Sequence, residues 1–285
     1  MRRLNYQYHM RLSFPLPVEN HHFTLRCLPI VDERQQIENQ NIYIEPSYIG
    51  GYDADSFGNR FIYGTVKNAH TQFLVKVTGT ACVDAALPVP ASELHKIGMF
   101  RYQTRLTGMG ASLHKLREKC EKKKADQTMY EDKHLKRNSF EKEEWEQNDI
   151  VERACELMDV VYQNFEYEPG VTNVTTTAEE AAMLGRGVCQ DYAHILLALC
   201  RMEWIPCRYV VGMMLGEGAS HAWIEVCDGT NWIALDPTHN RMVDDTYIRI
   251  SYGRDAQDCT INQGFFYGSR EQVQEILVVV EEMKE

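Results

Sequence analysis

Membrane-spanning and secretory features are missing from this sequence. No apolar run approaches the roughly 18 residues that a membrane-spanning helix requires. The first residues include Arg2 and Arg3 but no apolar stretch of the kind found in signal peptides. We therefore expect a cytoplasmic protein that has no membrane partner.

Basic residues are in the minority. The chain of 285 residues contains 30 Lys and Arg against 41 Asp and Glu, which gives a net charge of -11. Proteins that bind nucleic acids hold the phosphate backbone with clustered Lys and Arg. The acidic balance argues against a nucleic-acid partner.

Regular cysteine spacing is also absent. The nine cysteines are an odd number without the spacings of a disulfide framework, which favours reduced thiols in a cytosolic protein. Cys200, Cys207 and Cys227 form no CxxC pair, and His21 and His22 have no cysteine pair beside them. We expect no metal site and no cofactor.

The first third of the chain has the pattern of β-strands. Apolar residues occupy every second position from Leu4 to Phe14, which indicates a half-buried strand. Further β-rich runs are separated by turn-forming clusters such as Gly50-Gly51. Residues 1–90 are therefore predicted to form a small, sandwich-like all-β domain. The additional predicted strands are 23–27, 42–44, 61–66 and 73–77.

Residues 91–149 are polar and favour helix. Basic residues concentrate in 115–124 and acidic residues in 141–146. A docking surface is one interpretation, but solvated helices of mixed charge explain the composition more simply. We expect a polar helical connector.

The last segment, 150–285, alternates helical and strand patterns. An amphipathic helix is predicted from Ile150 to Val161, and a short helix follows a capping box at Thr176 or Thr177. A helix over 188–202 is apolar nearly all round, which is typical of a central buried helix. Strands are predicted at 208–214, 222–226, 232–235 and 276–280, with a hairpin turn at Asp228-Gly229.

Cys189 lies in the first turn of the predicted buried helix. Unpaired backbone N–H groups and the positive end of the helix dipole favour a negative charge there, as a thiolate nucleophile requires. Gly187 would leave room for a substrate backbone, and the N–H group of Cys189 or the side chain of Gln190 could stabilise an oxyanion. Taken alone, Cys189 could equally be an inert buried thiol.

A histidine and a carboxylate follow on neighbouring strands. His221 alternates with the apolar residues of its strand and so points away from the core, while Asp236 stands at the end of the next strand. Each has an ordinary structural explanation taken alone. With a two-residue turn at Asp228-Gly229, however, His221 and Asp236 would lie directly opposite each other. Asp236 could then orient the imidazole that takes the proton from Cys189.

Further polar residues lie near these three in the sequence. His194 should face away around the helix, and His239 is the alternative base but lies in a turn. Asp191 is explained as a residue that compensates the helix dipole, with substrate contact as the alternative. Trp223 shares the face of His221 and could wall an acyl pocket.

Arg208 is predicted to begin a central strand, where its charge would need a carboxylate partner, and Asp255 and Asp258 are the candidates.

Four motifs resemble, in order, the core of the transglutaminase-like superfamily. Downstream residues 252–255 and Asp258 extend the resemblance, and residues 55–59 resemble the β domain that precedes the catalytic domain in bacterial members. The core motifs are Gly187-Val188-Cys189-Gln190-Asp191-Tyr192-Ala193-His194, residues 206–212, Ser220-His221-Ala222-Trp223 and Leu235-Asp236-Pro237-Thr238.

The resemblance implies an α+β fold, in which the helix bearing Cys189 packs on an antiparallel sheet in a papain-like core behind a small all-β domain. It implies that Cys189 is the nucleophile, His221 the general base and acid, and Asp236 the orienting carboxylate. The expected reaction is acyl transfer from a peptide or isopeptide amide through a thioester, with hydrolysis favoured. A cross-linking transglutaminase and a non-catalytic peptide-binding module are the alternatives. The substrate and any self-association are left open.

Overall fold

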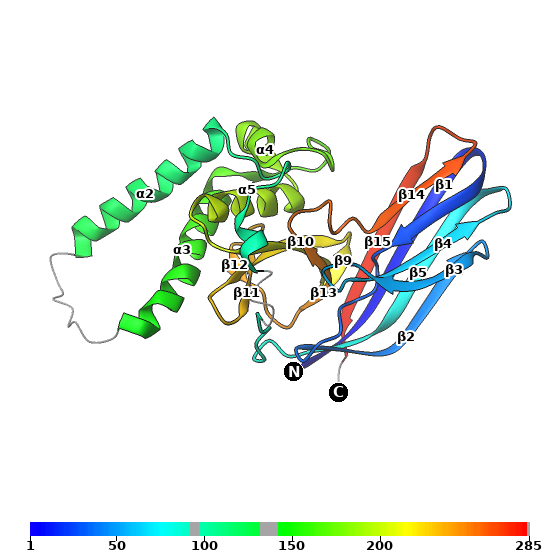
Figure 1. Ribbon diagram of the computed structural model, residues 1–285, viewed down its shortest axis with the longest axis horizontal. Coiled ribbons are helices and arrows are strands. Elements are labelled where there is room, and N and C mark those ends of the chain that lie inside the picture. The colour runs from blue at the N-terminus through cyan, green and yellow to red at the C-terminus, as the bar shows by residue number, and fades with distance from the viewer. Residues whose placement is uncertain (92–96, 132–141, 284–285) are drawn as a thin grey trace.

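The protein has a β lobe at one end and a lobe of helices and a second sheet at the other (Figure 1). The computed structural model describes residues 1–91, 97–131 and 142–283. Within these ranges, residues 124–131 and 142–148 are described by their backbone alone. The Met283 N–H donates to the Arg3 carbonyl at 3.0 Å, so the two ends of the described chain lie side by side. Over these described ranges, no helix has both the length and the apolar character to cross a bilayer.

A single long strand organises the β lobe. Strand β1 pairs with β5 and β15 through its first half, and with β4 and β14 through its second half. Pro15 and Pro17 lie where it passes from one set of partners to the other, since proline cannot donate to a strand ladder. The strands of this lobe that precede the connector are β1 (Arg2–Leu25), β2 (Gln35–Glu45), β3 (Ile49–Ala54), β4 (Arg60–Val66) and β5 (His70–Val83).

The alternating pattern from Leu4 to Phe14 does mark a buried strand face, as predicted. The prediction of a turn at Gly50-Gly51 is wrong, because both residues lie within β3. A Cβ atom on Gly50 would overlap the Tyr63 carbonyl oxygen on β4. This glycine therefore permits a close approach of two strands rather than a reversal of the chain.

The C-terminal strands return to the β lobe. β15 (Val273–Glu282) runs antiparallel along β1 from Leu4 to Ser13, and β14 (Asn262–Tyr267) also pairs with β1. β9 (Gly216–Gly218) pairs with β15 and so joins the second lobe to this sheet. The division into 1–90, 91–149 and 150–285 stays a proposal, since the first sheet takes strands from both ends of the chain.

The connector contains η1 (Gly98–Arg101) and α2 (Ala111–Glu131), and α2 lies beside α3 (Lys142–Asn164) in a hairpin that projects away from the β lobe (Figure 1). Glu179 fixes the start of α2 by accepting hydrogen bonds from the Ser112 and Leu113 backbone N–H groups at 2.8 and 3.1 Å. The predicted acidic stretch begins at a residue outside the described ranges, and the docking interpretation stays a prediction.

The second lobe is built around α5 (Cys189–Met202). Short strands β6 (Glu166–Tyr167) and β7 (Arg186–Gly187) and helix α4 (Ala178–Leu184) lead into it. Of the two possible capping boxes, the structure has the one at Thr177 with Glu180, and Gly185 ends α4 in the left-handed conformation. The five-stranded antiparallel sheet has the order β12-β11-β10-β8-β13. Its strands are β8 (Cys207–Met214), β10 (His221–Cys227), β11 (Trp232–Asp236), β12 (Arg241–Met242) and β13 (Tyr247–Gly253).

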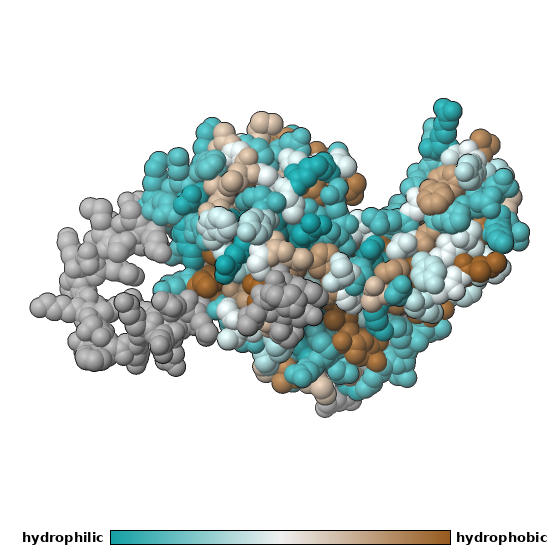
Figure 2. Space-filling model, viewed as in Figure 1, coloured by the Kyte–Doolittle hydropathy of each residue, from teal (hydrophilic) through white to brown (hydrophobic). Residues whose placement is uncertain are grey.

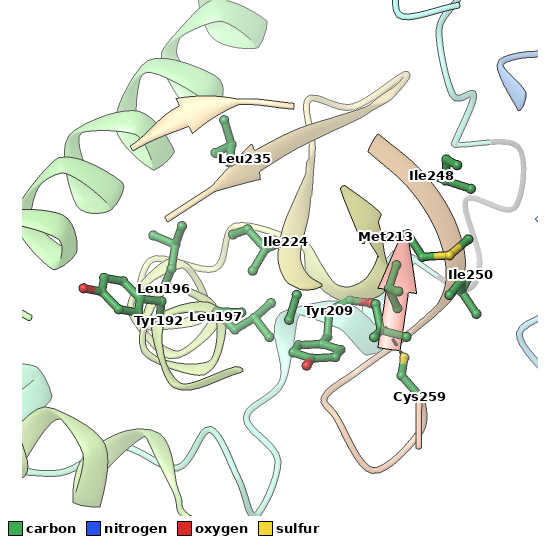
Figure 3. Close-up of a cluster of buried hydrophobic side chains, with 14 of the residues drawn as sticks. Tyr192, Leu196, Leu197, Tyr209, Met213, Ile224, Leu235, Ile248, Ile250 and Cys259 are labelled. Carbon is green, nitrogen blue, oxygen red and sulfur yellow. Dashed lines mark hydrogen bonds between the residues drawn. The ribbon is translucent and has the colours of Figure 1, made fainter. Parts of the chain in front are cut away.

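Helix α5 packs its apolar side onto this sheet. Leu196 and Leu197 face Ile224 and Tyr209 in a cluster closed to solvent (Figure 3). Burial of such side chains contributes roughly 1.5–3 kcal/mol each and fixes the helix on the sheet. The predicted α+β architecture is confirmed.

The face shown in Figure 2 is mostly hydrophilic with small separate apolar groups, in keeping with the net charge of -11.

The opposite face of the sheet buries an ion pair. Arg208 Nε donates to Glu225 Oε2 at 2.6 Å, and the guanidinium lies 4.2 Å from the Trp232 ring centroid and 3.8 Å from that of Tyr252. The prediction that Asp255 or Asp258 pairs with Arg208 is wrong. Glu225 stands opposite Arg208 in the ladder of β8 and β10, which brings the two charges together.

Two amide side chains of the β lobe cover the edge of β13. The Gln35 amide donates to the Arg249 carbonyl at 2.9 Å and accepts from the Arg249 N–H at 2.7 Å. The Asn59 amide donates to the Tyr252 carbonyl at 2.7 Å and accepts from the Tyr252 N–H at 2.9 Å. Both amides are almost fully buried. Each replaces the pair of hydrogen bonds that a neighbouring strand would make, and so joins the lobes through the backbone.

We expect Asn59→Asp to lower the free energy of unfolding by about 2–3 kcal/mol, because a carboxylate cannot donate to the buried Tyr252 carbonyl. Urea unfolding monitored by circular dichroism measures the change. Asn68→Asp, at an exposed position of the same lobe, is the matched control and should stay within about 0.5 kcal/mol of wild type. Equal stability of the two variants would show that the amide does not hold β13.

Candidate active site

Cys189 is the first residue of α5, and its side chain is half-buried. The turn is held by Asp191, whose Oδ2 accepts from the Val188 N–H at 2.8 Å and from the Thr172 hydroxyl at 2.6 Å. These bonds fix the chain on entry to the helix, so that Cys189 meets the unpaired N–H groups of the first turn. The predicted position at a helix N-terminus is confirmed.

Gly187 and Asp191 lie against each other at the start of α5, and Asp191 stands in the first turn of the helix, as predicted. A Cβ atom on Gly187 would overlap Asp191 Oδ2, so the missing side chain makes room for the carboxylate, and the predicted room for a substrate backbone stays a prediction. Asp191 is itself buried, and burial raises its pKa although the bonds from Thr172 and Val188 oppose the shift. Gln190 is half-buried beside Cys189, and its role at an oxyanion stays a prediction.

His221 and Asp236 are in contact, as predicted. His221 is the first residue of β10, Asp236 is the last residue of β11, and His221 Nε2 lies 2.8 Å from Asp236 Oδ2. The predicted register is wrong by two residues. The strand partner of Ile224 is Leu235, whereas a two-residue turn would have placed Ile233 there.

The turn itself explains the shift. Asp228 and Asn231 close a four-residue loop through a backbone bond of 3.1 Å, and the Asp228 carboxylate accepts from the backbone N–H groups of Thr230 and Asn231. This side-chain bonding favours the longer loop over the predicted two-residue turn. His221 therefore reaches Asp236 along a diagonal across the two strands.

The environment of His221 favours its charged form. Burial disfavours the imidazolium, but the hydrogen bond to Asp236 and the interactions with the Asp236 charge and the nearby Cys189 thiol raise the pKa of His221 to about 9. The ring thus lies between the thiol of α5 and the carboxylate of β11. The structure brings together the three residues that were predicted to act as a unit.

Asp236 accepts more hydrogen bonds than the sequence indicated. Its Oδ2 accepts from His221, from His239 Nδ1 and from the Tyr247 hydroxyl, each at 2.8 Å. Burial would raise the pKa of this carboxyl, but these three donors hold it well below its usual range. His239, the alternative base, therefore binds the same carboxylate as His221. No spacing in the sequence singled out Tyr247.

Two family models match the chain. The model described as the transglutaminase-like superfamily matches residues 138–237, and the bacterial transglutaminase-like N-terminal region matches residues 4–81. The chain belongs to the transglutaminase-like superfamily.

Curated proteins from mycobacteria are similar to part of this chain. A Mycobacterium tuberculosis protein described as uncharacterized is 32% identical over 138 residues, which are 43% of this chain and 44% of that protein. One from Mycobacterium leprae is 38% identical over 113 residues, 36% of this chain and 40% of the relative. The chain thus spans less than half the length of these relatives.

A crystal structure from Cytophaga hutchinsonii, described as that of a candidate cysteine protease, has the same fold. It matches with a TM-score of 0.74 at 22% identity, covering 100% of this chain and 91% of that one. The papain-like transglutaminase core and its preceding β lobe are confirmed as the fold.

The remaining polar candidates lie around the transglutaminase-like core. His194 is fully buried and its Nε2 accepts from the Ala256 N–H at 3.2 Å, which confirms that it faces away from Cys189. Trp223 is also fully buried, with its ring centroid 6.2 Å from that of His221 and the planes 29° apart. It packs beside the imidazole, and a direct role as a wall of an acyl pocket stays a prediction.

One group of possible metal ligands occurs among the described residues. His221, Asp236 and His239 offer ligand atoms within 4.8 Å of one another. The same atoms are engaged in the hydrogen bonds to Asp236 Oδ2, which account for their proximity. The expectation that this transglutaminase-like protein binds no metal stays a prediction.

The raised pKa of His221 makes stability depend on pH. A histidine whose pKa rises from 6.5 to about 9 on folding adds stability that is complete below pH 6.5 and is lost as the pH rises through 9. Between these pH limits, we expect the free energy of unfolding of wild type to fall by about 3 kcal/mol more than that of His221→Gln. Urea unfolding at about pH 6 and about pH 9.5 measures how the free energy of unfolding of each protein changes with pH. Parallel slopes would rule out a charged His221 in the folded protein.

Proposed function

We propose that this protein is a cysteine-dependent enzyme that transfers the acyl group of a peptide or isopeptide amide, with water as the usual acceptor. The observation that carries the proposal is the line of three groups formed by the Cys189 thiol, the His221 ring and the Asp236 carboxylate. A helix N-terminus and an imidazole favour the thiolate form of a cysteine, and a buried carboxylate holds the imidazole in place for proton transfer.

In the first step the Cys189 thiolate attacks the amide carbonyl. Backbone N–H groups at the start of α5 are suited to stabilise the developing oxyanion, because the preceding turn is fixed by Asp191. His221 holds a proton and gives it to the leaving amine. The products of this step are a free amine and a thioester on Cys189.

In the second step His221 takes a proton from water, which attacks the thioester and releases the acid. Asp236 keeps the imidazole oriented through both steps, since it accepts from Nε2 and leaves the other ring nitrogen toward Cys189. The candidate cysteine protease with the same fold supports hydrolysis over cross-linking. A peptide or protein amide in the cytoplasm is the proposed substrate.

An amide-directed acylating probe should label the wild-type protein and fail to label Cys189→Ala, because Cys189 is the cysteine that lies near enough to His221 to raise its pKa. Intact-protein mass spectrometry measures the adduct. Cys155→Ala is the matched control, since Cys155 is the other free cysteine of intermediate exposure among the described residues, and it should label like wild type.

Equal labelling of wild type and Cys189→Ala would contradict the enzyme assignment. It would leave a non-catalytic module that binds peptides in the same place. Circular dichroism of the Cys189→Ala protein checks that the fold is retained.

The second half-reaction can be tested separately. With a glutaminyl peptide and excess primary amine, we expect ammonia release without incorporation of the amine, because water resolves the thioester. Ammonia assays and mass spectrometry of the peptide measure the two outcomes. Stoichiometric incorporation of the amine would instead assign a cross-linking transglutaminase.

A further inference from the structure

Tyr247 extends the line of hydrogen bonds beyond Asp236. It is the first residue of β13, its side chain is buried, and its hydroxyl lies 2.8 Å from Asp236 Oδ2. Arg241, in β12, approaches the same hydroxyl with Nε at 3.0 Å and Nη2 at 2.8 Å. The two residues connect a positive charge to the carboxylate that orients His221.

The direction of these bonds is fixed by chemistry. A guanidinium can only donate, so the Tyr247 oxygen accepts both bonds from Arg241. The hydroxyl proton must then be donated to Asp236. Burial and the nearby Asp236 charge raise the pKa of Tyr247, so that the hydroxyl keeps its proton over the working pH range.

We propose that Arg241 and Tyr247 are positioning residues of the acyl-transfer site, which draw negative charge away from Asp236 and so let His221 release its proton to the leaving amine. The inference rests on the proposed function and adds two residues to it. Both residues act through Asp236 rather than by contact with the substrate.

The electrostatic reason is a balance at one oxygen. Asp236 raises the pKa of His221, and an unopposed carboxylate would hold the proton too firmly for general acid catalysis. The positive end of the Tyr247 hydroxyl dipole and the charge of Arg241 weaken this hold. Arg241 is itself 4.0 Å from the half-exposed Asp244.

Other groups also face His221. Cys189 comes from α5, and His239, with a side chain 41% exposed, donates to Asp236 from the turn after β11. Trp223 and Tyr247 are aromatic neighbours of the His221 ring. Cys189, Asp236 and His239 are unchanged in the Arg241 and Tyr247 variants below, so a shift between those variants reports on Arg241 and Tyr247.

The sign of a shift separates this role from a structural one. Tyr247→Phe and Arg241→Gln each remove positive potential near His221, so we expect its titration midpoint to rise by about 0.5 pH units. NMR of histidine-labelled protein without substrate measures the midpoint. Asp236→Asn should move it in the opposite direction. A lower or unchanged midpoint in Tyr247→Phe would overturn the inference.

Kinetics give a second readout. We expect kcat for an amide substrate to fall about tenfold in Tyr247→Phe with KM nearly unchanged, since the effect is on proton release. Tyr102→Phe, at an exposed position, is the matched control and should behave like wild type. If wild type itself shows no turnover, the proposed function fails, while the NMR titration still decides whether Arg241 and Tyr247 act on His221.

Discussion

The site depends on the negative charge of Asp236, which is held entirely inside the protein. Removing a carboxylate from water costs several kcal/mol unless donors replace its hydration. Here His221, His239 and Tyr247 converge on one oxygen, and the Thr238 N–H binds the other at 2.9 Å. Because these donors together balance the charge, the positions of their side chains are strongly coupled.

The donors reach Asp236 from separate elements, so the fold must hold these elements in place. β10 and β11 are fixed by their shared ladder and by the packing of α5. β13 is an edge strand, and its outer side is bonded by Gln35 and Asn59 of the β lobe. The β lobe therefore acts on the site from a distance, since it holds the strand that carries Tyr247.

The residues with a strong local pattern could be predicted from sequence. The helix of Cys189, the alternation around His221 and the strand end at Asp236 follow from periodicity and turn chemistry. The return of β15 to β1 and the clamp of Gln35 on Arg249 join residues more than 200 positions apart. No local pattern encodes such contacts. Tyr247 and Arg241 were missed because the bond from Tyr247 to Asp236, and the bonds from Arg241 to Tyr247, also depend on how separate strands meet.

The error in strand register shows why the site could still be predicted. A shift of two residues keeps every side chain on its own face of the sheet, because side chains alternate with a period of two. His221 and Asp236 therefore stayed on a common face and met along a diagonal. A shift of one residue would have turned Asp236 toward the apolar side of α5 and away from His221. The face of a strand, rather than the exact partner of a residue, is what the local pattern specified.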